Sequence, residues 1–272
     1  MTTLLKLEDL NVSFATPRGA LKAVRNVTIE LGAGESLGVV GESGSGKTVL
    51  SRATMGLLPS TATRTGAIVY QGEDISGWPS DKVRELWGVG MAMIFQDPMT
   101  ALNPVRRIGA QVTESLTVRL GMDKKAAKAR AIELLKRVRI PDPEGMLRKF
   151  PYQLSGGMRQ RIMIAIAVSC NPELLFADEP TTALDVTVQA QVLELLDELR
   201  KEYNTAMILV THDLGVVAGH TDKIAVMYAG DLVEYAPTPQ LFANMKMPYT
   251  EALLKSIPRL ETPTGTRDRK ST

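Results

Sequence analysis

The stretch GESGSGKT, from Gly41 to Thr48, constrains the fold of this chain more than any other feature. It matches the pattern G-x-x-x-x-G-K-[ST], whose glycines let backbone N–H groups surround a phosphate where a helix begins. The apolar run from Ser36 to Val40 before it predicts a buried strand, and a helical run follows it. A strand, a glycine loop and a helix in this order form the βα unit of a mostly parallel sheet. The sequence therefore predicts an α/β fold that binds a nucleotide through its phosphates.

All positions of this loop are candidate phosphate ligands: Gly41, Glu42, Ser43, Gly44, Ser45, Gly46, Lys47 and Thr48. The Lys47 ammonium is expected to reach the β- and γ-phosphates of ATP. The Thr48 hydroxyl is expected to bind Mg²⁺.

The stretch LLFADE, from Leu174 to Glu179, supplies an acidic pair that complements the loop. Its apolar residues predict a second buried strand, with Asp178 at the strand end to hold Mg²⁺. Glu179 follows at once, where it can accept a proton from an attacking water. An acidic pair after an apolar run also occurs in surface turns. The phosphate loop upstream favours the catalytic interpretation.

Hydrophobic patterning extends the α/β interpretation along the chain. Alternation predicts half-buried strands at residues 4–14 and 22–31, and short strands are expected at 66–70, 92–95, 174–177 and 206–210. Residues 222–228 and 231–235 predict an antiparallel pair around Ala229 and Gly230. Between Pro98 and Cys170 the pattern is instead helical, with an apolar stripe at Ala127, Ala131, Leu134, Leu135 and Val138. An extension of the main core is the alternative for this region.

These patterns predict four parts. We expect a discontinuous nucleotide-binding core at residues 1–97 and 171–235, and a helical subdomain at 98–170. A short helical extension is expected at 236–260, where prolines open two helices. The polar stretch 261–272 is expected to be a disordered tail.

Composition excludes several classes of function. The net charge is +2, which gives no basis for binding nucleic acid through bulk charge. Cys170 is the only cysteine among 272 residues, so we expect neither a disulfide framework nor an iron–sulfur cluster. The N-terminus carries charges where a signal peptide is apolar, and no run reaches the length of a membrane span.

Further motifs stand in the order typical of an ATP-binding cassette: Gln96 after the strand AMIF, LSGG at Leu154–Gly157, ALD at Ala183–Asp185 and His212 after ILVT. With these, the chain resembles the ABC-transporter ATP-binding subunits from about Leu4 to Pro258. The resemblance is strongest to subunits of oligopeptide and dipeptide importers, in IFQDPMTALNP, YQLSGGMRQRIMIAIA, FADEPTTALDVTVQAQVLELL and PYTEALLKSIP. It implies a P-loop NTPase core of the RecA-like type, with an antiparallel β region and an inserted α-helical subdomain.

The resemblance also implies a site shared between two chains. In this family two ATPase subunits close head to tail, with ATP between the phosphate loop of one and the LSGG of the other. Ser155, Gly156 and Gly157 would contact the γ-phosphate held by the partner, and Asp185 would lie across the interface. The hydroxyl and bare N–H groups of a helix start suit an anion.

Three single residues receive roles from the same resemblance. Gln96 would contact Mg²⁺ and the attacking water, and His212 the γ-phosphate. Phe14 would stack on adenine, with ordinary core packing as its alternative.

The function implied is that of the ATP-hydrolysing subunit of a peptide importer at the cytoplasmic face of the membrane. Its expected partners are a second ATPase subunit, identical or different, two transmembrane permease subunits and an extracytoplasmic substrate-binding protein. Related subunits serve nickel, opine or sugar uptake, so these cargoes remain alternatives. A soluble ABC ATPase without a transport role is a further alternative, although the chain has a single cassette and no long heptad coils.

Overall fold

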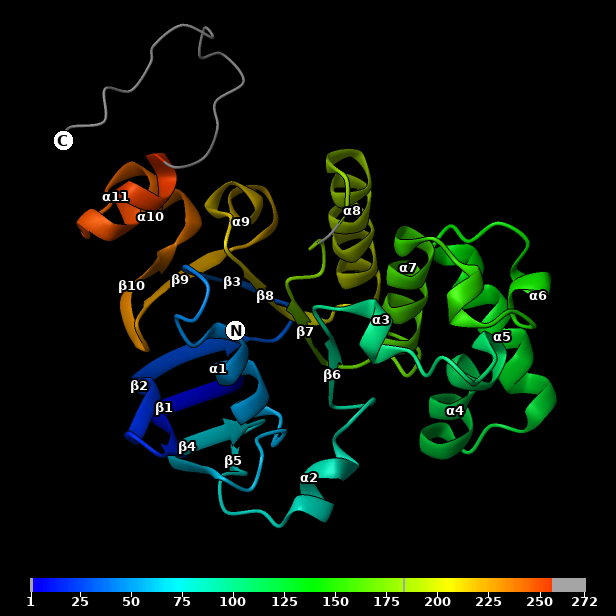
Figure 1. The fold of residues 1–272 in the computed structure, drawn as a ribbon, viewed down its shortest axis with the longest axis horizontal. Coiled ribbons are helices and arrows are strands. Elements are labelled where there is room, and N and C mark those ends of the chain that lie inside the picture. The colour runs from blue at the N-terminus through cyan, green and yellow to red at the C-terminus, as the bar shows by residue number, and fades with distance from the viewer. Residues whose placement is uncertain (1, 183, 256–272) are drawn as a thin grey trace, which may run out of the picture.

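The computed structural model describes residues 2–182 and 184–255. Five strands form the parallel part of the sheet: β3 (Ser36–Val40), β6 (Met91–Ile94), β7 (Leu174–Asp178), β8 (Ala206–Thr211) and β9 (Lys223–Tyr228). The other strands are β1 (Thr3–Thr16), β2 (Gly19–Gly32), β4 (Ala62–Tyr70), β5 (Glu73–Asp74) and β10 (Asp231–Pro237). Within the described part of the chain the order is β5-β4-β1-β2-β10-β9-β3-β8-β7-β6 (Figure 1). The predicted α/β class with a mostly parallel core and an antiparallel region is confirmed.

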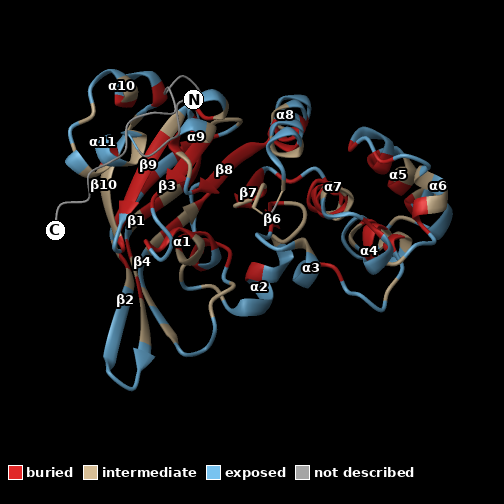
Figure 2. Cartoon of the chain, turned by 45° about the horizontal axis from the view of Figure 1, so that its top comes forward, coloured by how far each residue is buried: buried red, intermediate tan, exposed pale blue. Residues whose placement is uncertain are grey.

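The parallel strands are buried on both faces, which explains their continuous apolar sequences. Alternate residues of each strand belong to different hydrophobic clusters. In β7, Leu175 and Ala177 pack with residues of the helical stretch between 108 and 168. Leu174 and Phe176 instead pack with residues of β1, β2 and α1 (Lys47–Thr54). In Figure 2 these strands are largely buried, whereas the tip of the β1–β2 hairpin is exposed.

The stretch between Pro98 and Ala167 is helical. It contains α3 (Pro98–Ala101), α4 (Ile108–Leu120), α5 (Lys124–Arg137), α6 (Pro143–Met146), a 3₁₀ turn (Pro151–Gln153) and α7 (Gly156–Ala167). The predicted apolar stripe of α5 is buried, because it packs against α4, α6 and α7. The inserted helical subdomain is part of the confirmed fold class, whereas the four proposed domain boundaries stay predictions.

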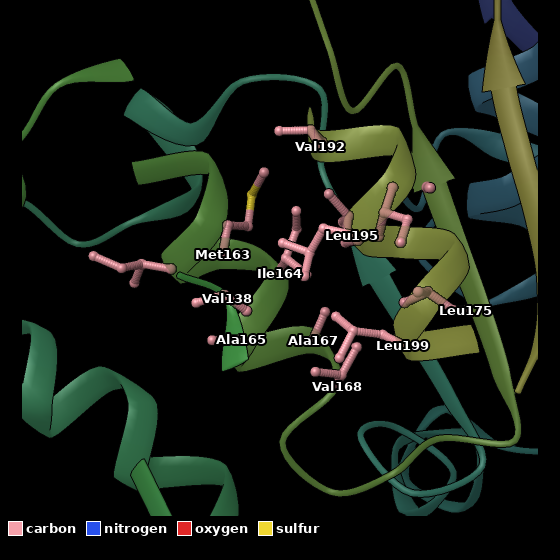
Figure 3. Packing of buried hydrophobic residues seen from close by; sticks show 14 of the residues in the cluster. Val138, Met163, Ile164, Ala165, Ala167, Val168, Leu175, Val192, Leu195 and Leu199 are labelled. Atoms are coloured by element: carbon pink, nitrogen blue, oxygen red, sulfur yellow. The ribbon is translucent and has the colours of Figure 1, made fainter. Parts of the chain in front are cut away.

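Helix α7 is held against α8 (Val186–Tyr203) by apolar side chains. Figure 3 shows Met163, Ile164 and Ala167 of α7 beside Leu195 and Leu199 of α8. All of these residues are less than 8% exposed. Burial of each large side chain contributes about 1.5–3 kcal/mol, so this packing fixes where the N-terminus of α7 lies.

The remaining helices are α2 (Ser80–Glu85), α9 (Leu214–His220), α10 (Thr238–Ala243) and α11 (Pro248–Lys255). Helices α10 and α11 lie beside β9 and β10 (Figure 1). Both occur where prolines predicted short helices. The predicted tail at 261–272, and residues 256–260 of the predicted extension, lie outside the described residues.

Some predicted boundaries differ from the structure. Helix α7 ends at Ala167, three residues before Cys170, which is buried in the turn that follows. Strand β4 begins at Ala62 rather than Gly66 and pairs antiparallel with β1. Of its first residues, Ala62 and Arg64 are partly buried and Thr63 and Thr65 are exposed, so too few apolar residues stand there to mark a strand in the sequence.

Candidate active site

The phosphate loop connects β3 to α1, and its backbone requires glycine. Gly44 and Gly46 have φ angles of 81° and 103°, a region that L side chains rarely adopt. A Cβ atom at Gly41 would lie 2.1 Å from the Met227 carbonyl oxygen, and one at Gly46 would lie 2.3 Å from that of Ala23. The glycines therefore permit both the turn and the close contact with β9 and β2.

The turn between β9 and β10 is hydrogen-bonded to the phosphate loop. The Gly230 N–H donates to the Ser45 carbonyl oxygen at 3.0 Å. Arg25 of β2 then fixes that turn, because its backbone N–H donates to Gly230 O and its guanidinium to Ala229 O, both at 2.8 Å. Within the loop Glu42, Ser43 and Gly44 remain exposed.

Lys47 is buried beneath the loop, 5% exposed. Its Nζ donates to the carbonyl oxygens of Gly41 and Glu42, each at 2.7 Å. Burial lowers the pKa of Lys47, while the nearby carboxylates of Glu179, Asp178 and Glu42 act in the opposite direction. Such a desolvated ammonium gains strongly from an approaching phosphate.

Thr48 and Asp178 meet at the expected metal position. The Thr48 hydroxyl donates to Asp178 Oδ1 at 2.9 Å, and Asp178 is 1% exposed. Burial raises the pKa of Asp178, and the hydrogen bond from Thr48 opposes that rise. A hydroxyl and one carboxylate are oxygen donors of the kind that Mg²⁺ takes beside substrate phosphates, so these residues fit the ion. Within the described ranges no group of three or more His, Cys, Asp or Glu residues forms a separate metal site.

Glu179 lies at the centre of a small polar network. Gln96 Nε2 donates to Glu179 Oε2 at 3.0 Å, and the Thr182 hydroxyl donates to the same oxygen at 2.8 Å. The Glu179 backbone has a φ of 45°, which costs a non-glycine residue about 1–2 kcal/mol. Its N–H donates to the Val210 carbonyl oxygen at 2.9 Å, so β8 holds this strained backbone in place.

His212 follows β8 and lies on the other side of the Glu179 carboxylate. Its Nδ1 is 3.5 Å from Glu179 Oε1, and its side chain is 64% exposed. The structure thus brings Gln96, Glu179 and His212 together at the carboxyl ends of β6, β7 and β8, where ligands of parallel sheets bind.

Ser155, Gly156 and Gly157 lie at the start of α7. The Met158 N–H donates to Ser155 Oγ at 3.3 Å, which makes Ser155 the N-cap. A serine hydroxyl that accepts one bond can still donate its proton, so this cap is compatible with phosphate contact. In the described part of the chain no hydrogen bond joins these three residues to the phosphate loop.

Asp185 caps the neighbouring helix. Its carboxylate accepts the Val188 N–H of α8 at 3.0 Å, and both Asp185 and Val186 are exposed. Gly157 lies next to this helix, because a Cβ on it would be 3.2 Å from Val188 Cγ1. The starts of α7 and α8 therefore form one exposed surface.

Phe14 is partly buried on β1, where it pairs with Leu21 of β2. It packs against the cluster beneath the antiparallel strands, which agrees with ordinary core packing. Its strand neighbour β2 also carries Ala23, whose carbonyl oxygen contacts the loop at Gly46. The stacking role of Phe14 stays a prediction.

Two residues near the site were not predicted from the sequence. Thr182 anchors Glu179, and the Tyr249 hydroxyl of α11 accepts the Glu42 N–H at 3.0 Å. A hydroxyl residue three positions after Glu179 could have suggested the first contact. No local signal connects Tyr249 with a loop more than 200 residues away.

Comparison with known families gives two matches on this chain. The model described as ABC transporter matches residues 24–182, and the model described as oligopeptide/dipeptide transporter, C-terminal region, matches residues 233–272. The first range contains the phosphate loop, LSGG and Glu179. The second contains β10 from Val233 onward, together with α10 and α11.

Curated relatives are similar over nearly the whole chain. The oligopeptide transport ATP-binding protein OppD of Bacillus subtilis is 49% identical over 263 residues, which cover 96% of this chain and 74% of the relative. The dipeptide transport ATP-binding protein DppD of the same organism is 48% identical over 263 residues, covering 96% and 78%.

Solved structures share the fold. One is the ATP-binding cassette MJ0796, a dimer in a post-hydrolysis state bound to ADP and phosphate, with a TM-score of 0.78 and 25% identity. The alignment with MJ0796 covers 86% of this chain and 99% of the MJ0796 chain. The cbiO1 protein of Clostridium perfringens has a TM-score of 0.74 and 28% identity, covering 90% and 92%.

Proposed function

This chain belongs to the ATP-binding proteins of the ABC transporter family, and we propose that it drives the import of oligopeptides or dipeptides by hydrolysing ATP. The family predicted from the sequence motifs is thereby confirmed. The observation that carries the peptide assignment is the combination of two matches. The curated relatives that cover 96% of the chain are named for peptide transport, and the region from 233 matches a peptide-transporter C-terminal model.

The chemistry of hydrolysis follows from the residues around the loop. Lys47 and the loop N–H groups would hold the phosphates of ATP. Thr48, Asp178 and Gln96 would hold Mg²⁺, which neutralises charge on the β- and γ-phosphates. Glu179 would accept a proton from the attacking water, since Gln96 and Thr182 fix one of its oxygens and leave the other facing His212.

A second ATPase subunit would complete the site from the other side of the γ-phosphate. Ser155, Gly156 and Gly157 would donate to it, with Asp185 beside the opposite loop. The exposure of Ser155, Gly156 and Asp185 supports this arrangement, as does their lack of a described hydrogen bond with their own phosphate loop. Contacts to the γ-phosphate would favour the closed dimer when ATP is bound. ADP has no γ-phosphate, so these contacts would be absent and the closed dimer would no longer be favoured.

The proposed partners in the membrane are two permease subunits, with a substrate-binding protein on the far side. None of the described helices has the length and apolar composition of a membrane span. We place the chain at the cytoplasmic face of the membrane, where it would drive the permeases through its own dimer closure.

Uptake measured in cells tests this proposal. A host that lacks the gene for this chain should lose uptake of a labelled tripeptide, and expression of the wild-type chain should restore it. Lys47→Ala should fail to restore it, because the main point charge on the phosphates is gone. Intact peptide uptake in the deleted host, together with lost nickel, opine or sugar uptake, would reassign the cargo. Normal uptake of all four would refute an import role.

A further inference from the structure

A single peptide group in the phosphate loop is held at both ends. The Gly41 carbonyl oxygen and the Glu42 N–H belong to the same peptide bond. The carbonyl accepts from Lys47 Nζ at 2.7 Å, and the N–H donates to the Tyr249 hydroxyl oxygen at 3.0 Å. Hydrogen bonds in such a chain polarise one another, so each strengthens its neighbour. Tyr249 is thus connected to Lys47 through one rigid, planar group.

The position of Tyr249 is set by the C-terminal strand rather than by the loop. Glu234 of β10 accepts the Lys246 N–H at 2.8 Å and the Thr250 hydroxyl at 2.6 Å. Thr250 is fully buried at 0% exposure, and these two bonds fix the first turn of α11. The Tyr249 ring also packs on Tyr228 at the end of β9, with 4.6 Å between ring centroids.

The chemistry of the Tyr249 hydroxyl suits this role. A tyrosine hydroxyl is neutral at physiological pH, and burial raises the pKa of Tyr249 further, so the hydroxyl can accept the Glu42 N–H without adding charge. It lines a shallow cavity of 190 Å³ with Glu42, Ser43, Gly44, Ser45 and Tyr228. Tyr249 therefore adds no negative charge beside the loop.

We propose that Tyr249 is a positioning residue for the phosphate loop, through which the C-terminal segment 233–255 sets the affinity for nucleotide. The proposal rests on the assignment of this loop as the ATP site. Without the Tyr249 hydroxyl, the peptide group between Gly41 and Glu42 is fixed at one end only. The loop then samples arrangements in which Lys47 and the N–H groups do not converge on a phosphate. Since a neutral hydrogen bond corresponds to a factor of about 3 to 10 in an equilibrium, affinity should fall by about that factor.

Paired tyrosine substitutions in the purified 272-residue chain test the proposal. Tyr249→Phe removes the hydroxyl at the loop. Tyr235→Phe is the matched control, because the Tyr235 hydroxyl also bonds to a backbone group, the Glu30 carbonyl oxygen at 2.8 Å, away from the loop. MgATP binding by calorimetry, amide hydrogen exchange of residues 41–46, and the unfolding midpoint without nucleotide are measured for each protein.

We expect the Kd for MgATP to rise about 3- to 10-fold in Tyr249→Phe, with faster exchange at the Glu42 amide. Tyr235→Phe should change neither, although both variants lower the unfolding midpoint. Glu234→Gln replaces one of the two acceptor oxygens that orient α11, so it should weaken binding in the same direction by about twofold. That variant also tests the idea if Tyr249→Phe does not fold.

Two results overturn the inference separately from the function. If the wild type binds MgATP and Tyr249→Phe binds it equally well, Tyr249 does not position the loop and the ATP site stands. Equal losses of affinity in both tyrosine variants would show a general effect of stability instead. A wild-type chain that binds no MgATP would refute the ATP site, and this inference with it.

Discussion

Glu179→Gln separates the proposed proton transfer from the hydrogen-bonding role of the Glu179 side chain. Gln96 and Thr182 both donate to Oε2, and His212 lies next to Oε1. A glutamine can place its carbonyl oxygen where Oε2 lies and keep both hydrogen bonds. Its amide nitrogen then faces His212 and cannot accept a proton from water. The geometry of the site is therefore kept, while the base and its negative charge are lost.

The size of the effect follows from these contacts. Loss of a general base slows turnover about 10²- to 10⁴-fold, which corresponds to about 2.7–5.4 kcal/mol in the barrier. Nucleotide affinity should change far less. The Glu179 charge helps Lys47 remain protonated but disfavours the ionised form of Asp178, so its removal acts on these two groups in opposite directions.

The assay is steady-state phosphate release, together with light scattering after size exclusion in ATP and in ADP. Glu179→Gln should accumulate as a closed dimer in ATP and dissociate in ADP, with the partner subunit present if the pair is heteromeric. Glu173→Gln is the matched control. Glu173 also accepts a hydroxyl and an amide on one oxygen, from Tyr70 and Gln71, but it precedes β7 at the opposite end from Asp178.

Wild-type turnover in Glu179→Gln would exclude Glu179 as the base. A loss of turnover without any ATP-dependent association would instead break the proposed connection between hydrolysis and a shared site. Equal losses in Glu173→Gln would show that the loss reflects damage to β7 rather than proton transfer.

Three further substitutions address the remaining parts of the site. Gly156→Asp should leave ATP binding to the separate subunit intact, because the chain has room for a Cβ there. It should lower ATPase activity about 10²-fold, because the new carboxylate would repel the γ-phosphate of ATP held by the partner. Unchanged activity would contradict this. Burial raises the pKa of Asp178, so its ionisation destabilises the nucleotide-free fold above that raised pKa and costs nothing below the ordinary value of 3.8. In scanning fluorimetry Asp178→Asn should therefore melt about 2–4 °C above wild type at pH 7. The difference in melting temperature should disappear as the pH falls toward 4. A lower melting temperature than wild type at pH 7 would oppose this reasoning. Thr182→Val removes one of two bonds that hold Glu179 Oε2 and should lower kcat about tenfold with KM for ATP unchanged; a raised KM alone would assign Thr182 to binding instead.

The parts of the fold that the sequence predicted are those with strong local signals. Ser36–Val40 is largely apolar and is followed by Gly41, and the structure has a strand with those bounds. The apolar stripe of α5 repeats at helical spacing, and it is buried. The motif residues Gln96, Glu179 and His212 follow three parallel strands, so the topology alone brings them to one sheet edge.

What the sequence could not predict depends on long-range packing. The contact between Tyr249 and Glu42 joins residues that are 207 positions apart, and it requires β10 and α11 to be in place first. Thr182 is close to Glu179 in sequence, but their bond depends on the left-handed backbone at Glu179, which no propensity favours for a glutamate. Burial of Asp178 and Lys47 likewise arises only when both hydrophobic clusters close around the sheet.

The glycines of this chain divide into those its own fold requires and those it does not. At Gly41 and Gly46 a side chain would collide with backbone oxygens at 2.1 and 2.3 Å, so the subunit alone explains both. At Gly156 the nearest atom to a Cβ would be Leu184 Cδ2, at 3.9 Å, which is ordinary contact. Gly156 is the first residue of α7, where the helix-interior penalty of up to about 1 kcal/mol relative to alanine applies only in part, so glycine gives the subunit by itself no gain in stability. A glycine that adds no stability and relieves no clash with the described residues of its own chain supports the proposal that what must approach it closely is the nucleotide of a second subunit.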